Sequence, residues 1–247
     1  MFARNTKDLI TFMIINIYLM LKHIINLLFP KVCAGCKSIL LSEEICICTN
    51  CRHEIPLTNH HLKVKNEIHQ LFYGKIALEF AASLFYFQKH GLVQELIFSL
   101  KYRGNQEIGT ILGHWLGENI KNLPIVDSFD YIIPVPLHSR KLRKRGYNQV
   151  TTFGKALSEV LEKPFEENTL KRVTYSKSQT QKSFLKRTQI DKTAFDVSFI
   201  DAHHNKHFLL IDDVLTTGST IEACAIALQK IPGVKISLVT ISITNSF

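Results

Sequence analysis

The sequence predicts an α/β fold, in which a parallel sheet is flanked by helices and preceded by a small cysteine-held module. Phe208–Ile211 is an apolar run, as expected of a strand buried on both faces. A loop of small residues and an amphipathic helix follow it. Five of the six cysteines lie within residues 33–51. We therefore expect an apolar helix in residues 1–26, a small cysteine-held module in 27–58 and the α/β domain in 75–247.

Composition narrows the class of ligand. The chain has 247 residues, 46% of them hydrophobic, which supports a substantial core. Its formal net charge is +9 and its pI is about 9.2, so phosphates, nucleic acid or anionic lipid are favoured as ligands. Cysteines at metal-site spacing indicate a reducing compartment, and we expect a cytoplasmic protein.

The N-terminal segment is apolar over Leu9–Leu21 and is interrupted by Lys22 and Asn26. A membrane span needs about 20 mostly apolar residues, and no convincing signal-cleavage site follows. Three readings stay open. The first is a docking or interfacial helix, with weak membrane association through residues 9–29 at the inner face of the membrane. The second is a start assigned too far upstream, so that residues 1–26 are not made. The third is a true anchor.

Two C-x2-C pairs follow, Cys33 with Cys36 and Cys48 with Cys51. Each pair can bend through a tight turn and present two thiolates to one ion, so the four predict a tetrahedral, structural Zn²⁺ site. Cys46 competes with Cys48 as a ligand, and the spacing of the first pair favours Cys48. The alternative is a redox dithiol.

The middle of the chain contributes the first part of the α/β domain. We expect a helix end or turn at Ile68–Gly74, one or two strands in Ile76–Phe87, and helices at Leu92–Leu100 and Ile108–Ile120. A basic turn, Lys101–Gly104, follows the first of these helices. The histidines of this region, His60, His61 and His69, are expected to be solvated, with the alternative that one of them stands in as a metal ligand.

A candidate anion site follows the short buried strand Tyr131–Ile133. Two prolines stiffen the next loop, and five basic residues lie within Arg140–Arg145. A charge run is commonly a solvated face. Its position beside a strand end instead favours phosphate, which arginine binds in bidentate fashion.

The stretch Leu170–Phe195 is also basic. It carries seven lysines and arginines and little apolar periodicity, so we expect a mobile loop. The alternative is a disordered surface loop that touches nucleic acid.

Phe208–Thr220 carries the strongest chemical signal. The buried strand ends in Asp212 and Asp213, and a loop of small residues then opens a helix. Backbone amides and hydroxyls of such a loop suit a phosphate, while the carboxylates suit ribose hydroxyls or a hydrated Mg²⁺. The loop residues are Thr216, Thr217, Gly218, Ser219 and Thr220. Val234–Ile243 is expected to pack beside Phe208–Ile211 as a further strand, completing a right-handed βαβ unit.

The thirteen residues Phe208–Thr220 resemble the phosphoribosyl-pyrophosphate (PRPP) signature of type I phosphoribosyltransferases. Together with the cysteine pairs after Leu27–Pro30, the Lys101–Gly104 turn, the Pro134–Leu137 loop and Arg145–Gln149, they resemble the ComF family of competence proteins, which includes GntX-like proteins. The likeness covers about residues 27–244. It implies a zinc-ribbon-like module, a phosphoribosyltransferase-like domain and an association with DNA uptake in natural competence.

The resemblance also implies residue roles. Asp212 and Asp213 would be catalytic, and Thr216–Thr220 would hold the PRPP 5-phosphate with Mg²⁺ nearby. Ile190 departs from the family, which usually has asparagine there, and this bears on closure of the basic loop. The pyrophosphate loop and flap would consist of Pro136, Leu137, His138, Ser139, Arg140, Arg172, Lys177, Gln179 and Arg187.

Two functions fit these residues. The first is a phosphoribosyltransferase that moves a ribose phosphate from PRPP to an acceptor; the chain shows no base-recognition element or glutaminase domain to name that acceptor. The second is a non-catalytic module that binds a nucleotide or single-stranded DNA and acts with a helicase-like partner. Stacking of a strand usually needs aromatic side chains among the basic ones.

Overall fold

The structure is a computed structural model that describes residues 6–173 and 194–244. It divides into two compact units, Met1–His53 and Glu54–Phe247. The first unit contains helix α1 (Thr6–Leu28) and most of α2 (Thr49–Glu54). Along α1 large apolar side chains are exposed on all sides, including Phe12, Ile17 and Ile25. Among the described residues, we find no helix with the length and apolar character that crossing a membrane requires.

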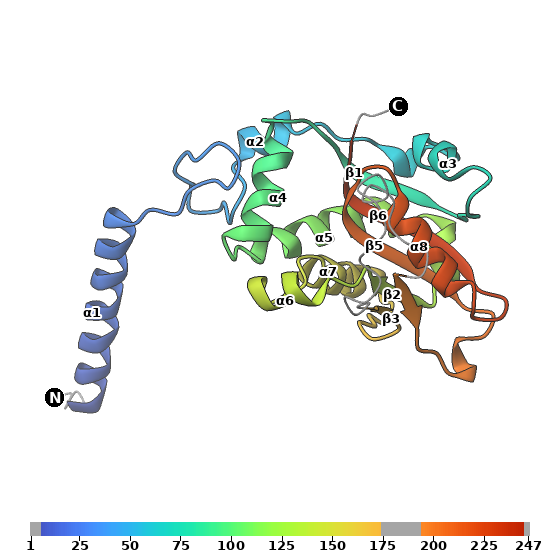
Figure 1. Ribbon diagram of the computed structural model, residues 1–247. Coiled ribbons are helices and arrows are strands. Elements are labelled where there is room, and N and C mark those ends of the chain that lie inside the picture. Colours follow the sequence, from blue (N-terminus) through green and yellow to red (C-terminus); the bar gives the residue numbers. More distant parts are fainter. Residues whose placement is uncertain (1–5, 174–193, 245–247) are drawn as a thin grey trace. The chain divides into compact units, whose positions relative to one another are not determined.

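The second unit is built on a four-stranded sheet (Figure 1). Its strands are β1 (Ala81–Phe87), β2 (Tyr131–Pro134), β5 (His207–Leu215) and β6 (Lys235–Thr244), and they lie in the order β1-β6-β5-β2. All neighbouring pairs are parallel. The expected parallel sheet is therefore confirmed, with the two C-terminal strands paired as predicted.

Strand β5 lies inside the sheet, which explains its apolar run. Phe208–Ile211 has no exposed surface, because β2 and β6 flank it and helices cover both faces. Phe208 and Leu210 pack in one core cluster with residues of α8 and α3. On the other face, a Cβ placed at Gly154 of α7 would lie 2.5 Å from Ile211 Cδ1.

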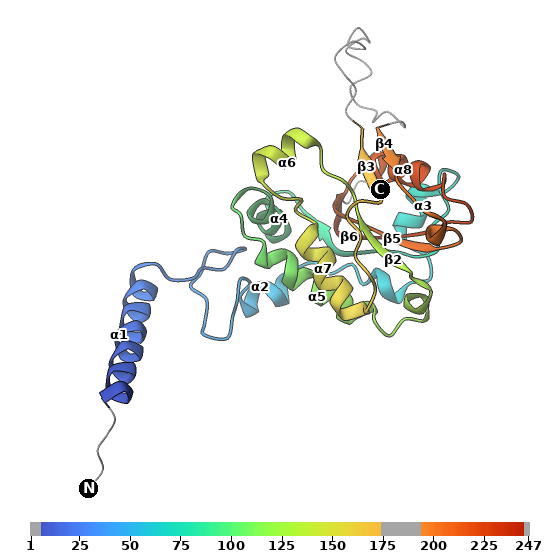
Figure 2. The same ribbon diagram turned by 90° about the horizontal axis from the view of Figure 1, so that it is seen from below.

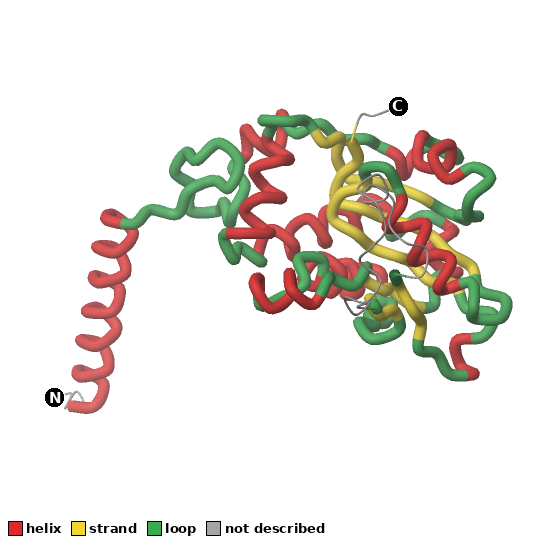
Figure 3. Tube along the Cα trace, viewed as in Figure 1, coloured by secondary structure: helices red, strands yellow, loops and turns green. Residues whose placement is uncertain are grey.

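Helices surround the strands (Figure 3). Helices α5 and α7 lie on one side of the sheet, and α3 and α8 lie on the other (Figure 2). The predicted helices at Leu92–Leu100 and Ile108–Ile120 are confirmed. The bounds are α3 (Glu67–Phe72), α4 (Leu92–Tyr102), α5 (Glu107–Ile120), α6 (Ser139–Arg145), α7 (Thr151–Leu161), α8 (Ser219–Leu228), and the 3₁₀ turns η1 (His60–Leu62), η2 (Pro124–Ser128) and η5 (Asp201–His203).

Helices α5 and α7 pack through a row of glycines on α5, Gly109, Gly113 and Gly117. A Cβ at Gly113 would lie 2.3 Å from the carbonyl oxygen of Phe153 on α7, and one at Gly117 would lie 2.8 Å from Val160 Cβ. Residues four apart share one helix face. The glycine row therefore lets the two backbones approach closely.

The basic stretch 170–196 begins and ends in a small antiparallel ribbon. Strands β3 (Leu170–Arg172) and β4 (Phe195–Val197) pair with Arg172 opposite Phe195, and the guanidinium carbon of Arg172 lies 5.1 Å from the centre of that ring. The predicted flap residues Lys177, Gln179 and Arg187 lie outside the described residues.

Candidate functional site

The carboxyl end of β5 carries the loop Thr216–Thr220 and the start of α8. The first two threonines of the loop are exposed, and its last two hydroxyl residues are half-buried. The amide of Glu222 donates to Gly218 O (2.8 Å), so the amides before it have no acceptor within the helix. Hydroxyl and amide donors therefore meet at a turn that is open to solvent.

Gly218, at the centre of this loop, has a left-handed backbone conformation (φ 77°). A Cβ here would lie 2.8 Å from Cε1 and Cζ of Phe72. Phe72 is the last residue of α3 and is buried. The loop thus requires glycine for two reasons, its conformation and the aromatic ring packed against it.

The acidic pair consists of two unlike carboxyls. Asp213 is buried, and its Oδ2 accepts a hydrogen bond from Gln149 Nε2 (2.6 Å) and lies 2.8 Å from Lys101 Nζ. Asp212 is half-buried, and its Oδ1 accepts the amide of Asp213 (2.8 Å). Burial, and then the negative charge of Asp213, raise the pKa of Asp212 to about 8. Asp213 is thus engaged inside the protein, whereas Asp212 has no such cationic partner within hydrogen-bond distance among the described residues.

The motifs Lys101–Gly104 and Arg145–Gln149 meet at Asp213. The arginine of the second motif donates to Oε1 of its glutamine, and its guanidinium carbon lies 5.3 Å from the centre of the Tyr102 ring. The hydroxyl of Tyr147 donates to a carbonyl of α4. Sequence reasoning missed this network, because nothing in the chain shows which carboxylate a distant lysine will meet.

The Pro136–Arg140 segment begins two residues after β2 ends and includes the first two residues of α6. The predicted loop is helical from Ser139 onward, and His138 Nδ1 caps the helix by accepting the amide of Arg140 (3.1 Å). The pKa of His138 is lowered by burial and then by the positive charges of Arg172 and Arg140. The positive charge of Arg172 therefore acts on a residue of this segment.

A cationic cavity of about 320 Å³ lies beside this network. It is lined by Lys101, Tyr102, Gly104, Lys141, Lys144, Arg145 and Tyr147. Phe98 extends its aromatic surface along α4, with its ring centre 5.1 Å from that of Tyr102, and Arg103 lies 5.1 Å above the Phe98 ring. Aromatic and basic side chains therefore alternate on one surface, although they come from segments far apart in the sequence.

The first unit holds a four-cysteine cluster. The sulfur atoms of Cys33, Cys36, Cys48 and Cys51 all lie within 4.8 Å of one another. The amides of Cys48 and Cys51 donate to Cys33 Sγ (3.3 Å) and Cys48 Sγ (3.5 Å). This set contains Cys48 and not Cys46, as the spacing predicts. Four sulfur donors at one point fit a tetrahedral zinc site.

The prediction that His60 is solvated is wrong. Its side chain is fully buried, its Nδ1 accepts the amide of Ser83 (3.2 Å), and its Nε2 lies 2.8 Å from Glu67 Oε1. Tyr86 donates to the same oxygen (2.7 Å). The polar neighbours of this histidine in sequence suggested solvent, but its partners come from α3 and β1. His61 and His69 are half-buried rather than exposed.

Comparison with known proteins finds sequence similarity to a competence protein and to DNA utilization proteins. Competence protein F of Haemophilus influenzae is 37% identical over 101 residues, which are 40% of this chain and 44% of that protein. DNA utilization protein YhgH of Salmonella typhi is 30% identical over 136 residues, 53% of this chain and 58% of that protein. The chain is a homologue of these two proteins. The resemblance to the ComF family is thereby confirmed, and the matches span about half the length of each relative.

No family model matches the chain. Among solved structures, glutamine PRPP amidotransferase from B. subtilis, complexed with ADP and GMP, has a TM-score of 0.37 at 15% identity and covers 57% of this chain and 30% of that chain. Adenine phosphoribosyltransferase from Leishmania tarentolae has a TM-score of 0.36 at 13% identity and covers 77% of this chain and 94% of that chain.

Proposed function

We propose that the ComF homologue binds PRPP, or a related ribose 5-phosphate ligand, at the carboxyl end of β5. The observation that carries this proposal is the open loop Thr216–Thr220 at the start of α8, directly after a buried strand that ends in two carboxyls. Amide and hydroxyl donors at a helix N-terminus suit a 5-phosphate, and the dipole of α8 adds to the attraction.

Asp212 is the carboxyl that we assign to the ribose or to the metal on the diphosphate. Asp213 supports it, held in place by Lys101 and Gln149. Crowding of two carboxyls favours a cation beside them, because a positive charge offsets the repulsion that raises the pKa of Asp212. Bound Mg²⁺ would supply charge neutralisation to the departing pyrophosphate.

The pyrophosphate is assigned to the Pro136–Arg140 segment. Support comes from Arg172, whose charge acts on His138 of this segment. Two guanidinium groups, from Arg140 and Arg172, would then stabilise negative charge as the bond at the ribose C1 breaks. Lys177, Gln179 and Arg187 remain predictions for the same role. The reaction that these groups would support is transfer of the phosphoribosyl group to an acceptor.

Isothermal titration with PRPP and Mg²⁺ tests the site. Asp212→Asn and Ser219→Ala should each weaken binding about tenfold or more, because each removes a polar contact to a charged ligand. Asp201→Asn is the matched control, since Asp201 is fully exposed on η5. If all three variants bind PRPP with the affinity of the wild type, PRPP does not bind at this loop. Pyrophosphate release, screened over candidate acceptors, separates an enzyme from a binding module.

A second function is favoured by the cationic cavity and the Phe98–Tyr102 surface. We propose that this surface binds single-stranded nucleic acid, with phosphates on Lys141 and Lys144 and a base stacked on Tyr102. Tyr102 is 62% exposed, so its ring is accessible from solvent. A relative named for DNA utilization gives the proposal its biological setting.

Fluorescence anisotropy with a labelled oligothymidylate at several salt concentrations tests the second function. Lys141→Gln with Lys144→Gln should weaken binding and make the slope of log K against log salt less steep. The change in slope should correspond to the loss of about two phosphate contacts. Tyr102→Ala should weaken binding about tenfold and leave the slope unchanged. Lys155→Gln on α7 is the control. A slope that the lysine variants leave at the wild-type value would contradict phosphate binding here.

A further inference from the structure

A larger cavity lies elsewhere on the second unit. It measures about 740 Å³ and is formed by the end of α3, the loop that follows it and the residue after α8, Gln229. Apolar side chains, Phe72, Ile76 and Leu78, contribute to its lining. It shares no lining residue with Thr216–Thr220 or with the acidic pair. Cavities of about 300–1,000 Å³ that are mainly apolar with a few polar groups are typical small-molecule sites.

The polar part of the lining includes two cationic side chains beside neutral ones. Lys65 and Lys75 both line the cavity, and neither forms an ion pair with any residue that the structure describes. No carboxylate is among the described residues of the lining. The site therefore offers positive charge beside an apolar floor, which favours an anion with a hydrophobic body.

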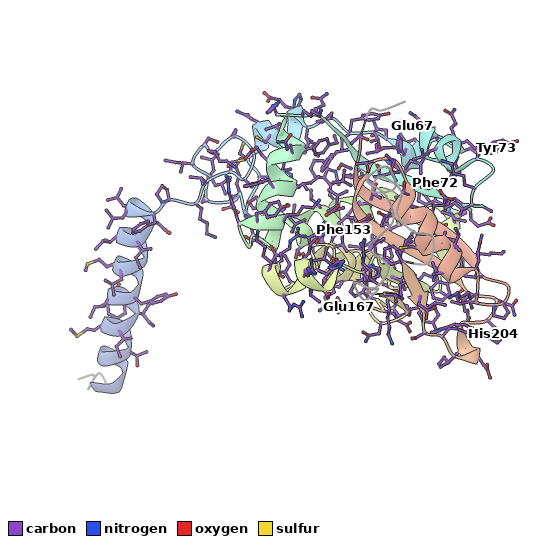
Figure 4. The ribbon with its side chains drawn as sticks, viewed as in Figure 1. Glu67, Phe72, Tyr73, Phe153, Glu167 and His204 are labelled. Carbon is purple, nitrogen blue, oxygen red and sulfur yellow. The ribbon has the colours of Figure 1, made fainter. Side chains whose placement is uncertain are left out.

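Phe72 links this cavity to the loop after β5. Phe72 is one of the residues that line the cavity, and its ring would meet a Cβ placed at Gly218 at 2.8 Å. Phe72 and Tyr73 follow one another at the end of α3 (Figure 4). Close-packed contacts transmit small displacements, so a molecule that shifts the Phe72 ring also moves the support of Gly218.

We propose that this cavity is a second ligand site, which binds a small anion with an apolar body, and that Phe72 transmits its occupancy to Gly218. The site goes beyond the proposed PRPP function, and it requires neither PRPP nor nucleic acid. A carboxylate or a phosphate would serve as the anionic group, with Lys65 and Lys75 as its partners.

Titration of the full chain with 2-naphthoate, followed by amide chemical shifts in ¹H–¹⁵N NMR spectra, tests the proposal. The amides of Gly74 and Ala77 should shift first, and that of Gly218 should shift with the same dissociation constant. The amide of Gly117, which lies between α5 and α7, should not move. The neutral analogue 2-naphthamide should bind about tenfold more weakly, because it lacks the charge.

The lysines provide the matched variants. Lys65→Gln with Lys75→Gln should weaken 2-naphthoate about tenfold and leave 2-naphthamide unchanged, whereas Lys89→Gln, an exposed lysine after β1, should change neither. Unaltered naphthoate affinity in the double variant would overturn the anion site. Shifts at Gly74 that appear on concentrating the protein without naphthoate would overturn it too, since the groove would then be a contact between copies. Shifts at Gly74 without any at Gly218 would overturn the coupling.

Discussion

At the scale of single residues, the two signature aspartates differ more than their adjacency suggests. Asp213 is paired with Lys101, while Asp212 has no such partner within hydrogen-bond distance among the described residues and its pKa is raised to about 8 by burial and by Asp213. A carboxyl whose pKa rises on folding retains a proton that the unfolded chain has lost. The free energy of unfolding must therefore fall as pH rises from about 4 towards 8.

Asp212→Asn should abolish this pH dependence. We expect the variant to be about as stable as the wild type near pH 4 and more stable at pH 8, by about 1.4 kcal/mol for each unit by which folding raises the pKa of Asp212, because the amide carries no charge to bury. Urea unfolding at both pH values measures the difference, with Asp201→Asn as the exposed control. If the wild type has the larger free energy of unfolding at pH 8, then Asp212 is ionised in the folded protein and its charge has favourable partners.

At the scale of elements, the contact between α5 and α7 depends on missing side chains. Gly113→Val would place a branched side chain against the Phe153 carbonyl, where a Cβ alone already approaches to 2.3 Å. Overpacking of this kind costs about 1–3 kcal/mol of unfolding free energy. Glu118→Val is the matched control, because it puts the same residue on an exposed position of α5 whose ion-pair partner, Lys121, lies at the end of the same helix. If Gly113→Val and the wild type have equal unfolding midpoints in urea, α5 and α7 accommodate the added side chain without loss of stability.

Some elements were predictable from sequence and others were not, for physical reasons. The apolar run at Phe208–Ile211 predicted β5, because a strand buried on both faces is largely apolar, and the alternating, mostly apolar stretch Val234–Ile243 predicted β6. Helix α6 was missed, since a run of basic residues has no apolar periodicity. The ribbon β3–β4 was missed as well, because three-residue strands leave too short a pattern to detect.

The candidate site shows the same division. The loop Thr216–Thr220 and the cysteine spacing are local patterns, and the structure places their atoms together as local geometry requires. The pairing of Lys101 with Asp213 and the burial of His60 depend on which distant segments meet. No local pattern encodes those partners, so they emerged only from the three-dimensional arrangement.

At the scale of the whole molecule, the two units should respond differently to removal of metal. Atomic absorption should find about one zinc per chain, lost in Cys36→Ser and Cys51→Ser but retained in Cys46→Ser. The protein's one tryptophan, Trp115, lies in the second unit and reports on its unfolding. A chelator should strip the zinc and leave the urea midpoint of Trp115 fluorescence unchanged. A large shift of that midpoint would mean that the second unit depends on the cysteine cluster.

The bond between Lys101 and Asp213 joins positions from the two halves of the chain, and Gln149 reaches the same oxygen across 64 positions. Contacts so remote along the polypeptide form late in folding, after the cost of closing long loops has been met. A proteolysed chain that lacks α4 would leave Asp213 without its cationic partner in the interior, and a nascent chain that ends before β5 would leave Lys101 without its carboxylate. The ligand site and the complete fold would then form together, and a partly synthesised chain would have neither.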